Sequence, residues 1–307
     1  MPQLTRAPRA QTGGTTVILL TGATGSIGRH LVRRLTDRGA DFRALVRDEA
    51  KGRALGCPYA VGDFDRPTSL TAAFAGVDRL FLGGPGALPV DGEQPMVRQL
   101  TAAIDAAAAA GVERVVKVSV WHAAPGGLLA QGAHGVLDRR LAAAGPAWSL
   151  LQPSGFLQNL LAPGAFTPDG RLVARYGGAP VSHIDARDVA ECAEVLLTGA
   201  ARPGESFVLT GPQALTDREL AERIAHALHR PVGLAPFAPA EVAAALTAQG
   251  APPGFAAALA GLLHEVAAGS LAGVTDAVPA LLGRPARTVD AFLADHLPAV
   301  RAAAQLP

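Results

Sequence analysis

The sequence predicts an α/β protein with a doubly wound parallel sheet, followed by a smaller, mostly helical cap. Two observations predict this fold. Short apolar runs alternate with helical segments through the first half of the 307 residues, and the first run leads directly into a glycine-rich loop and a helix. Alternation of this kind is typical of parallel sheets. The expected strands lie at residues 16–20, 41–46, 58–61, 79–82, 115–120, 148–151 and, later, 205–209.

The glycine-rich loop, residues 21–28 (TGATGSIG), is the most informative motif. It follows a continuous apolar run and opens a helix whose apolar face carries Leu31 and Leu35 and whose end is expected at Gly39. Glycines permit the tight turn and let backbone N–H groups approach a pyrophosphate, while the helix N-terminus adds partial positive charge. The strand–loop–helix context favours a dinucleotide site over a glycine-rich turn without ligand. The predicted contacts are Gly22, Thr24, Gly25, Ser26, Ile27 and Gly28.

Arg47, at the end of the second strand, indicates which dinucleotide binds. NAD sites usually carry an acidic residue about twenty residues after the glycines, to hold the ribose 2′-hydroxyl. Here that place holds Val46 and Arg47, and a guanidinium suits a 2′-phosphate. NADP(H) is therefore expected, with Lys51 as a second contact of the phosphate. The alternative is that Arg47 and Lys51 are ordinary solvated side chains.

Composition excludes several classes of protein. A net charge of +1 gives no reason to expect nucleic acid or an anionic membrane surface. Cys57 and Cys192 form neither a metal-ligand spacing nor a disulfide framework, and the histidines show no metal-ligand pattern, so we expect a cytoplasmic protein without a metal. Residues 1–14 are polar and are expected to form a flexible tail rather than a signal peptide. Nothing in the sequence excludes an oligomer.

Three further helices are expected, over about residues 96–110, 128–144 and 184–197, the last with Asp185 as its N-cap. Beyond residue 155 the alternation loosens, and prolines and glycines interrupt the chain. We therefore expect a nucleotide-binding domain over residues 15–155. Residues 156–307 are expected to form a substrate-binding cap, of which about residues 181–210 return to the sheet.

Several polar or glycine residues fall just after expected strands, namely Asp63, Gly83, Gly84, Pro85 and Ser119. In doubly wound sheets the ligand lies across the carboxyl ends of the strands, where the strand order reverses. These residues are therefore expected to lie together with the glycine-rich loop and Arg47 at one edge of the sheet.

With these motifs the chain resembles the NmrA-like, atypical branch of the short-chain dehydrogenase/reductase superfamily, from Thr16 to about Phe292. The resemblance implies a Rossmann sheet. The matching segments are residues 21–28, 44–47 (ALVR), 62–63 (GD), 109–119 (AAGVERVVKVS), 153–156 (PSGF) with Asn159, 183–190 (HIDARDVA), 215–221 (LTDRELA) and 282–287 (LGRPAR).

The resemblance implies particular contacts with NADP(H). Glycines of the loop would hold the pyrophosphate and Arg47 the 2′-phosphate, while Asp63 and Phe64 would meet the adenine. The stretch 83–85 would run beside the nicotinamide ribose. Pro153, Gly155 and Phe156 would lie beside the nicotinamide, near Ser119. For Asp63, an ordinary turn or helix-capping aspartate is the alternative.

One departure from the superfamily concerns the proton relay. Most short-chain dehydrogenases use a Tyr-x-x-x-Lys pair, in which lysine lowers the tyrosine pKa. This chain has only Tyr59 and Tyr176, neither followed by lysine four residues on, and its expected helix carries His134 and Asp138 instead. Many NmrA-like proteins also lack the pair. Reduction of a quinone or conjugated system still needs only hydride delivery, charge stabilisation and a proton that water can supply.

Three residues are candidates for the missing acid or oxyanion donor. His122 follows the fifth strand and is expected to point into the cleft. His134 stands where the tyrosine would be, where Asp138 one turn later would orient it; the alternative is a surface histidine paired with Asp138. Ser119 is at the strand end, with a backbone hydrogen bond as its alternative role.

Aromatic residues after the nucleotide domain indicate an apolar, aromatic or polyketide-like substrate, of the kind found in secondary metabolism. The expected substrate contacts are Trp121, His122, Phe156, Asn159 and Tyr176. The leading hypothesis is an NADPH-dependent oxidoreductase that transfers hydride to a conjugated carbonyl, quinone or related aromatic compound. The alternatives are a non-catalytic NADP(H)-binding redox sensor, and a non-redox isomerase or cyclase that retains the nucleotide site.

Overall fold

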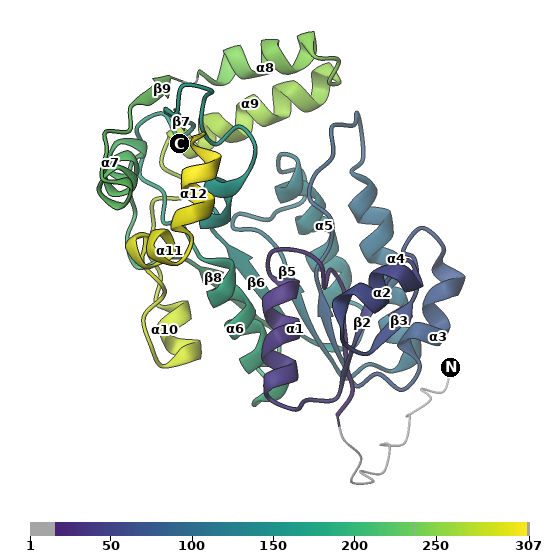
Figure 1. Ribbon diagram of the computed structural model, residues 1–307. Helices are drawn as coiled ribbons and strands as arrows, with labels where there is room; N and C mark the ends of the chain where they lie inside the picture. The colour runs from purple at the N-terminus through teal and green to yellow at the C-terminus, as the bar shows by residue number, and fades with distance from the viewer. Residues whose placement is uncertain (1–15, 237, 306–307) are drawn as a thin grey trace.

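The computed structural model describes residues 16–236 and 238–305, and its centre is a seven-stranded parallel sheet (Figure 1). The strand order is β3-β2-β1-β4-β5-β6-β8, with every neighbouring pair parallel. This confirms the doubly wound α/β fold. The predicted tail, residues 1–14, lies outside the described residues. The sheet strands are β1 (Ile18–Leu20), β2 (Phe42–Val46), β3 (Tyr59–Val61), β4 (Arg79–Leu82), β5 (Arg114–Val118), β6 (Ala147–Pro153) and β8 (Glu205–Leu209).

Helices cover both faces of the sheet. On one face α1 (Gly28–Asp37) packs against α6 (Ala186–Thr198); on the other α3 (Leu70–Phe74), α4 (Pro95–Ala110) and α5 (Ala130–Ala142) pack in sequence. Each face has its own buried apolar cluster. Because β1 pairs with both β2 and β4, the direction of winding reverses at β1, and that reversal opens a crevice at the carboxyl ends of these strands.

Helix α1 follows from the sequence pattern. Leu31, Val32 and Leu35 are buried on one stripe, and the opposite face is rich in arginine. The helix ends at Asp37, and Gly39 adopts a left-handed φ of 67° that turns the chain into β2.

The second half of the chain returns to the sheet and then builds a helical region beside it. Asp185 caps α6 by accepting a hydrogen bond from the Arg187 N–H, as expected, and β8 adds the seventh strand beside β6. The remaining elements are η2 (Leu157–Leu161), β7 (Leu172–Ala174), α7 (Asp217–Leu228), β9 (Leu234–Pro236), α8 (Pro239–Ala248), α9 (Pro253–Ala267), α10 (Ala277–Leu282), α11 (Val289–Asp295) and α12 (Leu297–Ala303).

Within this region η2, α7, α11 and α12 share a third buried cluster. Helices α8 and α9 pack on each other as a hairpin that stands above the rest of the region in Figure 1. Helix α9 reaches back over the carboxyl edge of the sheet, where Gly254 lies against Asp91 and Gly261 against Leu128.

Short elements account for the differences from expectation. The sequence pattern does not predict α2 (Glu49–Leu55), η1 (Pro67–Ser69) or α3, because segments this short have no resolvable helical period. Strand β5 ends at Val118, two residues before the predicted end. Strands β7 and β9 form a separate parallel pair of three residues each, which periodicity cannot reveal. None of the helices in the described ranges is both long and apolar enough to cross a membrane.

Candidate functional site

A cleft of about 380 Å³ opens at the carboxyl ends of β1 to β4, where the strand order reverses. Most of the residues expected to hold the cofactor line it: Gly22, Thr24, Gly25, Arg47, Lys51, Asp63, Phe64, Gly83, Gly84 and Pro85. The predicted convergence is present for the ends of β1 to β4, whereas Ser119, at the end of β5, does not line this cleft. The lining also includes residues that were not predicted, Thr21, Ala23, Leu45, Val46, Gly62, Asp65 and Gln99.

The glycine-rich loop is shaped by contacts that leave no room for side chains. Gly22 has a φ of 66°, and its carbonyl accepts the Gly25 N–H at 3.0 Å. A Cβ atom on Gly28 would lie only 2.1 Å from the Gly22 oxygen. The backbone N–H groups of Thr24, Ser26 and Ile27 form no hydrogen bond with the described residues, so they remain free for an anion at the start of α1.

Thr21 fixes this loop to the next strand. Its hydroxyl donates to the Gly83 carbonyl at 2.6 Å and accepts the Gly83 N–H at 2.9 Å. The loop after β1 and the end of β4 are thereby held at a constant separation on either side of the cleft. The sequence contains a signal for this role, because a threonine directly after a buried strand is a side chain that must find a partner.

Arg47 and Lys51 lie on the same side of the cleft but differ in their partners. The exposed Arg47 side chain forms no hydrogen bond or ion pair with the described part of the chain, whereas Lys51 pairs with Asp48 at 3.2 Å. Asp48 also caps α2 by accepting the Lys51 N–H. An unpaired guanidinium beside the end of β2 suits a 2′-phosphate. Arg47 is thus available for that role, while Lys51 has to share its charge with Asp48.

Asp63 forms a turn, as expected for its alternative role, and it also lines the cleft, so its contact with the adenine stays a prediction. Its carboxylate accepts the Asp65 N–H at 3.0 Å and lies 3.4 Å from Arg66, so it forms a turn, and it also lines the cleft beside Phe64. Gln99 of α4 enters the same lining and donates to Asp65 at 2.9 Å. Free N–H groups, a glycine-rich loop and an unpaired arginine together fit the phosphates of a dinucleotide.

A buried ionic cluster lies beyond this cleft, between β5 and α5. The Lys117 ammonium, fully buried, donates to Asp138 at 2.8 Å, to Nδ1 of His134 at 2.8 Å and to the Val118 carbonyl at 3.3 Å. All three of its protons therefore have partners. The Ser119 hydroxyl donates to the second oxygen of Asp138 at 2.6 Å. Ser119 is itself buried, and its hydroxyl is hydrogen-bonded to this side chain rather than to the backbone.

This cluster corrects the expected roles of Asp138 and His134. Asp138 orients Lys117 and Ser119 rather than His134, and His134 is buried rather than a surface histidine. Burial and the Lys117 charge lower the pKa of His134 to about 3, so its ring is neutral at pH 7. Lys117 was not predicted, although a lysine inside an apolar strand run signals a buried cation that needs a carboxylate.

Trp121 and His122 lie apart from both the cleft and the cluster. His122 does not point into the cofactor cleft as expected. Its ring is exposed, stacks on Trp121 with centroids 4.9 Å apart, and places Nε2 2.8 Å from the Ser270 carbonyl. The φ of 63° at His122 turns its side chain toward an open hollow beside Gln131 and Glu265.

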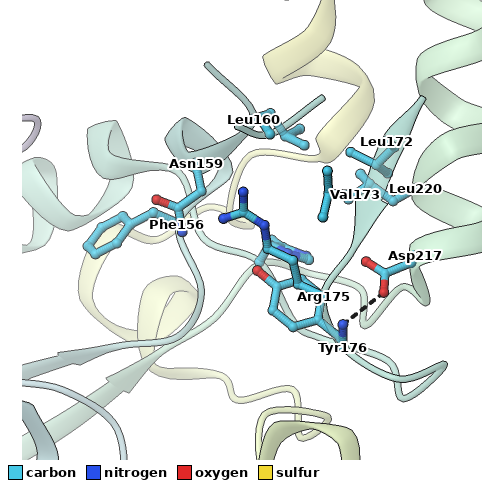
Figure 2. A pocket seen from close by; sticks show the side chains of 11 residues that line it. Phe156, Asn159, Leu160, Leu172, Val173, Arg175, Tyr176, Asp217 and Leu220 are labelled. Atoms are coloured by element: carbon cyan, nitrogen blue, oxygen red, sulfur yellow. Dashed lines mark hydrogen bonds between the residues drawn. The ribbon is translucent and has the colours of Figure 1, made fainter. Parts of the chain in front are cut away.

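The other three expected substrate contacts do come together. Phe156, Asn159 and Tyr176 line one hollow beside β7 and α7 (Figure 2). Phe156 directly follows the stretch 153–155 at the end of β6, and Gly155 lies against Val181 and His183 there. Pro153, Gly155, Phe156 and Ser119 do not line the cofactor cleft itself, so their predicted contact with the nicotinamide stays a prediction.

Two buried histidines should make the stability of the fold depend on pH. The pKa of His134 is about 3 and that of His183 about 4, both lowered mainly by burial. A histidine in the unfolded chain titrates near 6.5, so the unfolded state takes up protons before the folded state does as the pH falls. The folded state is therefore most stable above pH 6.5 and loses stability below it. We expect the free energy of unfolding to drop by about 2 kcal/mol per histidine between pH 7.5 and 4.5.

Urea unfolding of a His134→Asn variant at these two pH values measures this contribution. The variant should lose about 2 kcal/mol less than the wild type over this range, because one of the two histidines no longer titrates. His264→Asn, at an exposed position of α9, is the matched control. An unchanged pH dependence in the His134 variant would show that burial of this ring does not control the titration.

The fold and the cleft define a dinucleotide-binding protein of the doubly wound α/β class. A family model described as NAD(P)H-binding matches residues 22–198, more than half of the chain. The chain therefore belongs to the NAD(P)H-binding family.

Known relatives cover nearly all of the chain. An NAD(P)H azoreductase of Xenophilus azovorans is 37% identical over 94% of this chain and 100% of its own length. A (4-alkanoyl-5-oxo-2,5-dihydrofuran-3-yl)methyl phosphate reductase of Streptomyces griseus is 34% identical over 91% of this chain and 98% of its own. Among solved structures, an NADPH-dependent quinone oxidoreductase of Escherichia coli complexed with NADPH matches with a TM-score of 0.78 and 28% identity, over 91% of this chain and 99% of that one.

Proposed function

We propose that this protein is an NADPH-dependent oxidoreductase that transfers hydride to a conjugated carbonyl, a quinone or a related aromatic small molecule. The observation that carries the proposal is the cleft at the strand-order reversal, with free loop N–H groups and an unpaired Arg47. Relatives of nearly full length that are named as an azoreductase, a quinone oxidoreductase and the dihydrofuranylmethyl phosphate reductase given above support the reaction class.

The chain's own residues bind and orient the cofactor. The free N–H groups of Thr24, Ser26 and Ile27 would hold the pyrophosphate, and Arg47 would hold the 2′-phosphate. Thr21 keeps the loop and Gly83 apart at a fixed distance. Bound NADPH supplies the hydride. Ser119, buried at the end of β5, is held by the hydrogen bond that its hydroxyl donates to Asp138.

Protonation of the product proceeds without a Tyr-x-x-x-Lys pair. The Lys117 ammonium has three partners, and Nδ1 of the neutral His134 ring accepts one of its hydrogen bonds. This cluster holds Ser119 in place. Each N–H of the lysine already has a partner, so the lysine has no proton free for the substrate. A substrate whose reduced form is a stabilised hydroquinone or enolate takes its proton from water, so a dedicated acid is unnecessary.

Spectrophotometry of NADPH consumption with 1,4-naphthoquinone tests the proposed function. We expect saturable oxidation of NADPH in proportion to quinone reduced. Binding of NADPH without oxidation by any quinone, enone or dye would instead indicate the redox sensor, and conversion of a substrate without net NADPH consumption would indicate the isomerase or cyclase. Either result would overturn the reductase proposal.

Replacing Arg47 with aspartate tests the choice of cofactor. The variant should bind NADPH at least about tenfold more weakly, because a charge-assisted contact with the 2′-phosphate is replaced by repulsion. NADH binding should change little, since NADH lacks that phosphate. Fluorescence titration of both cofactors measures the two affinities. Arg33→Asp, an exposed position of α1 outside the cleft lining, controls for the change in net charge; equal NADPH affinity in both variants would contradict the assignment.

A further inference from the structure

The hollow that holds Phe156, Asn159 and Tyr176 contains polar atoms without partners. Apolar side chains form most of its wall: Leu160, Ala165, Leu172, Val173 and Leu220. Figure 2 shows Arg175 and Tyr176 pointing into the space between Phe156 and these leucines. His183 completes the lining, with its ring centroid 5.5 Å from that of Tyr176.

The charged groups of this hollow are already engaged. Asp217 accepts the Tyr176 backbone N–H at 2.9 Å, and the Arg175 guanidinium donates to the Gly164 carbonyl. The Tyr176 hydroxyl, by contrast, forms no hydrogen bond with the described residues, and the buried Nδ1 of His183 likewise lacks one among them. A buried polar atom without a partner costs about 1–3 kcal/mol. Nδ1 of His183 is such an atom. The Tyr176 hydroxyl is not fully buried and belongs to the neighbouring ring, whose centroid lies 5.5 Å away. Both groups are therefore open to a hydrogen bond from a ligand in this hollow.

Charge and size limit what that ligand atom can be. Burial lowers the pKa of His183 to about 4, against a partial offset from the Val181 carbonyl, and burial raises the pKa of Tyr176. At pH 7 both groups are therefore neutral and suit a neutral oxygen rather than a phosphate. The hollow measures about 30 Å³, which is room for a single oxygen-sized group and too little for an aromatic ring.

A hydroxyl group matches both unpaired atoms, because it accepts from the Tyr176 phenol and donates to a neutral imidazole nitrogen. Because the hollow is this small, the ring that carries the hydroxyl then has to lie outside it. We propose that this hollow binds the hydroxyl group of a hydroxylated aromatic substrate, with Tyr176 and His183 as its two hydrogen-bonding partners. This inference rests on the proposed function and specifies the substrate class of that same site.

Calorimetric binding of 2-naphthol and of 2-methylnaphthalene to the NADP⁺-loaded protein tests the inference without turnover. The wild type should bind 2-naphthol, and Tyr176→Phe should weaken that binding about tenfold while changing 2-methylnaphthalene affinity less than about twofold. The comparison of two ligands and two proteins isolates the contact between the hydroxyls. Tyr59→Phe, at the other tyrosine of the chain and outside both linings, should behave as the wild type.

A second variant, His183→Phe, should weaken 2-naphthol binding in the same selective way, with circular dichroism as the check of folding. If 2-naphthol does not bind the wild type, or if both ligands respond equally to Tyr176→Phe, the hollow holds a water molecule only and the inference is overturned. Oxidation of NADPH by unsubstituted 1,4-naphthoquinone, measured on the same proteins, reports separately on the proposed function.

Discussion

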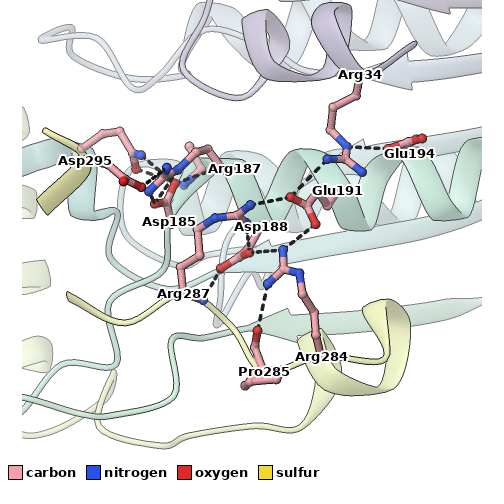
Figure 3. Close-up of polar contacts among 12 residues, drawn as sticks. Arg34, Asp185, Arg187, Asp188, Glu191, Glu194, Arg284, Pro285, Arg287 and Asp295 are labelled. Atoms are coloured by element: carbon pink, nitrogen blue, oxygen red, sulfur yellow. Dashed lines mark hydrogen bonds and ion pairs between the residues drawn. The ribbon is translucent and has the colours of Figure 1, made fainter. Parts of the chain in front are cut away.

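An Asp188→Ala variant is expected to lose about 3 kcal/mol of unfolding free energy. Asp188 is completely buried on α6, where its carboxylate accepts the Arg287 N–H at 2.7 Å and side-chain hydrogen bonds from Arg284 and Arg287 (Figure 3). Removing one member of a buried ion pair leaves the opposite charge without compensation, which typically costs 3–5 kcal/mol. The two guanidiniums are partly exposed and keep Glu191 as a partner, so the lower end of that range applies.

The network around Asp188 explains why its loss reaches beyond one helix. Glu191 binds Arg284, Arg287 and, at 3.2 Å, Arg34 of α1, so α1, α6 and the segment between α10 and α11 meet at one cluster. Nearby, Arg187 joins Asp185 to Asp295. The charges therefore tie the C-terminal helices to the face of the sheet that α1 covers.

Urea unfolding measures the effect against a matched pair of variants. Asp290→Ala removes a carboxylate that pairs with Arg223 in the same region but at an exposed position, and it should cost less than about 1 kcal/mol. Asp188→Asn, which keeps an acceptor but not the charge, should fall between the two. An Asp188→Ala variant within about 1 kcal/mol of the wild type would contradict the role assigned to this carboxylate.

The sequence predicts most of the cleft lining, because each of those residues is tied to a strand end. Strands β4 and β8 begin and end where predicted, and the residues after β1, β2, β3 and β4 line one cleft. Local periodicity determines these positions, and the parallel topology then brings them together. No long-range information was needed for Arg47 or Gly83.

The sequence predicts the far end of the site less well, because its contacts depend on the register between elements. His134 and Asp138 are one turn apart on α5, yet the group that joins them, Lys117, comes from β5. Similarly, His183 meets Tyr176 only because the chain after β7 folds back beside the end of β6. His122 was expected in the cleft, but the left-handed backbone there directs the ring elsewhere.

A Gly28→Val variant is expected to bind NADPH at least about 100-fold more weakly than the wild type. A Cβ atom at this position would stand 2.1 Å from the Gly22 carbonyl oxygen and 2.7 Å from the Ala23 Cα. Both neighbours are backbone atoms of the glycine-rich loop, so the loop itself has to move. Such a shift displaces the N–H groups of Thr24, Ser26 and Ile27, on which the anion site depends.

Gly86→Ala is the matched control for this change. Gly86 lies at the same edge of the sheet, and a Cβ atom there would meet no atom within 4 Å. Equilibrium titration with NADPH, beside a thermal melt of each apoprotein, separates loss of the anion site from loss of the fold. Wild-type affinity in a folded Gly28→Val protein would mean that the pyrophosphate is held elsewhere. We expect the Gly28→Val protein to melt cooperatively and to bind NADPH weakly, and the Gly86→Ala protein to bind NADPH as the wild type does. This result would locate the phosphate at the start of α1, because the side chain added at residue 28 displaces the loop there and the one added at residue 86 meets no atom.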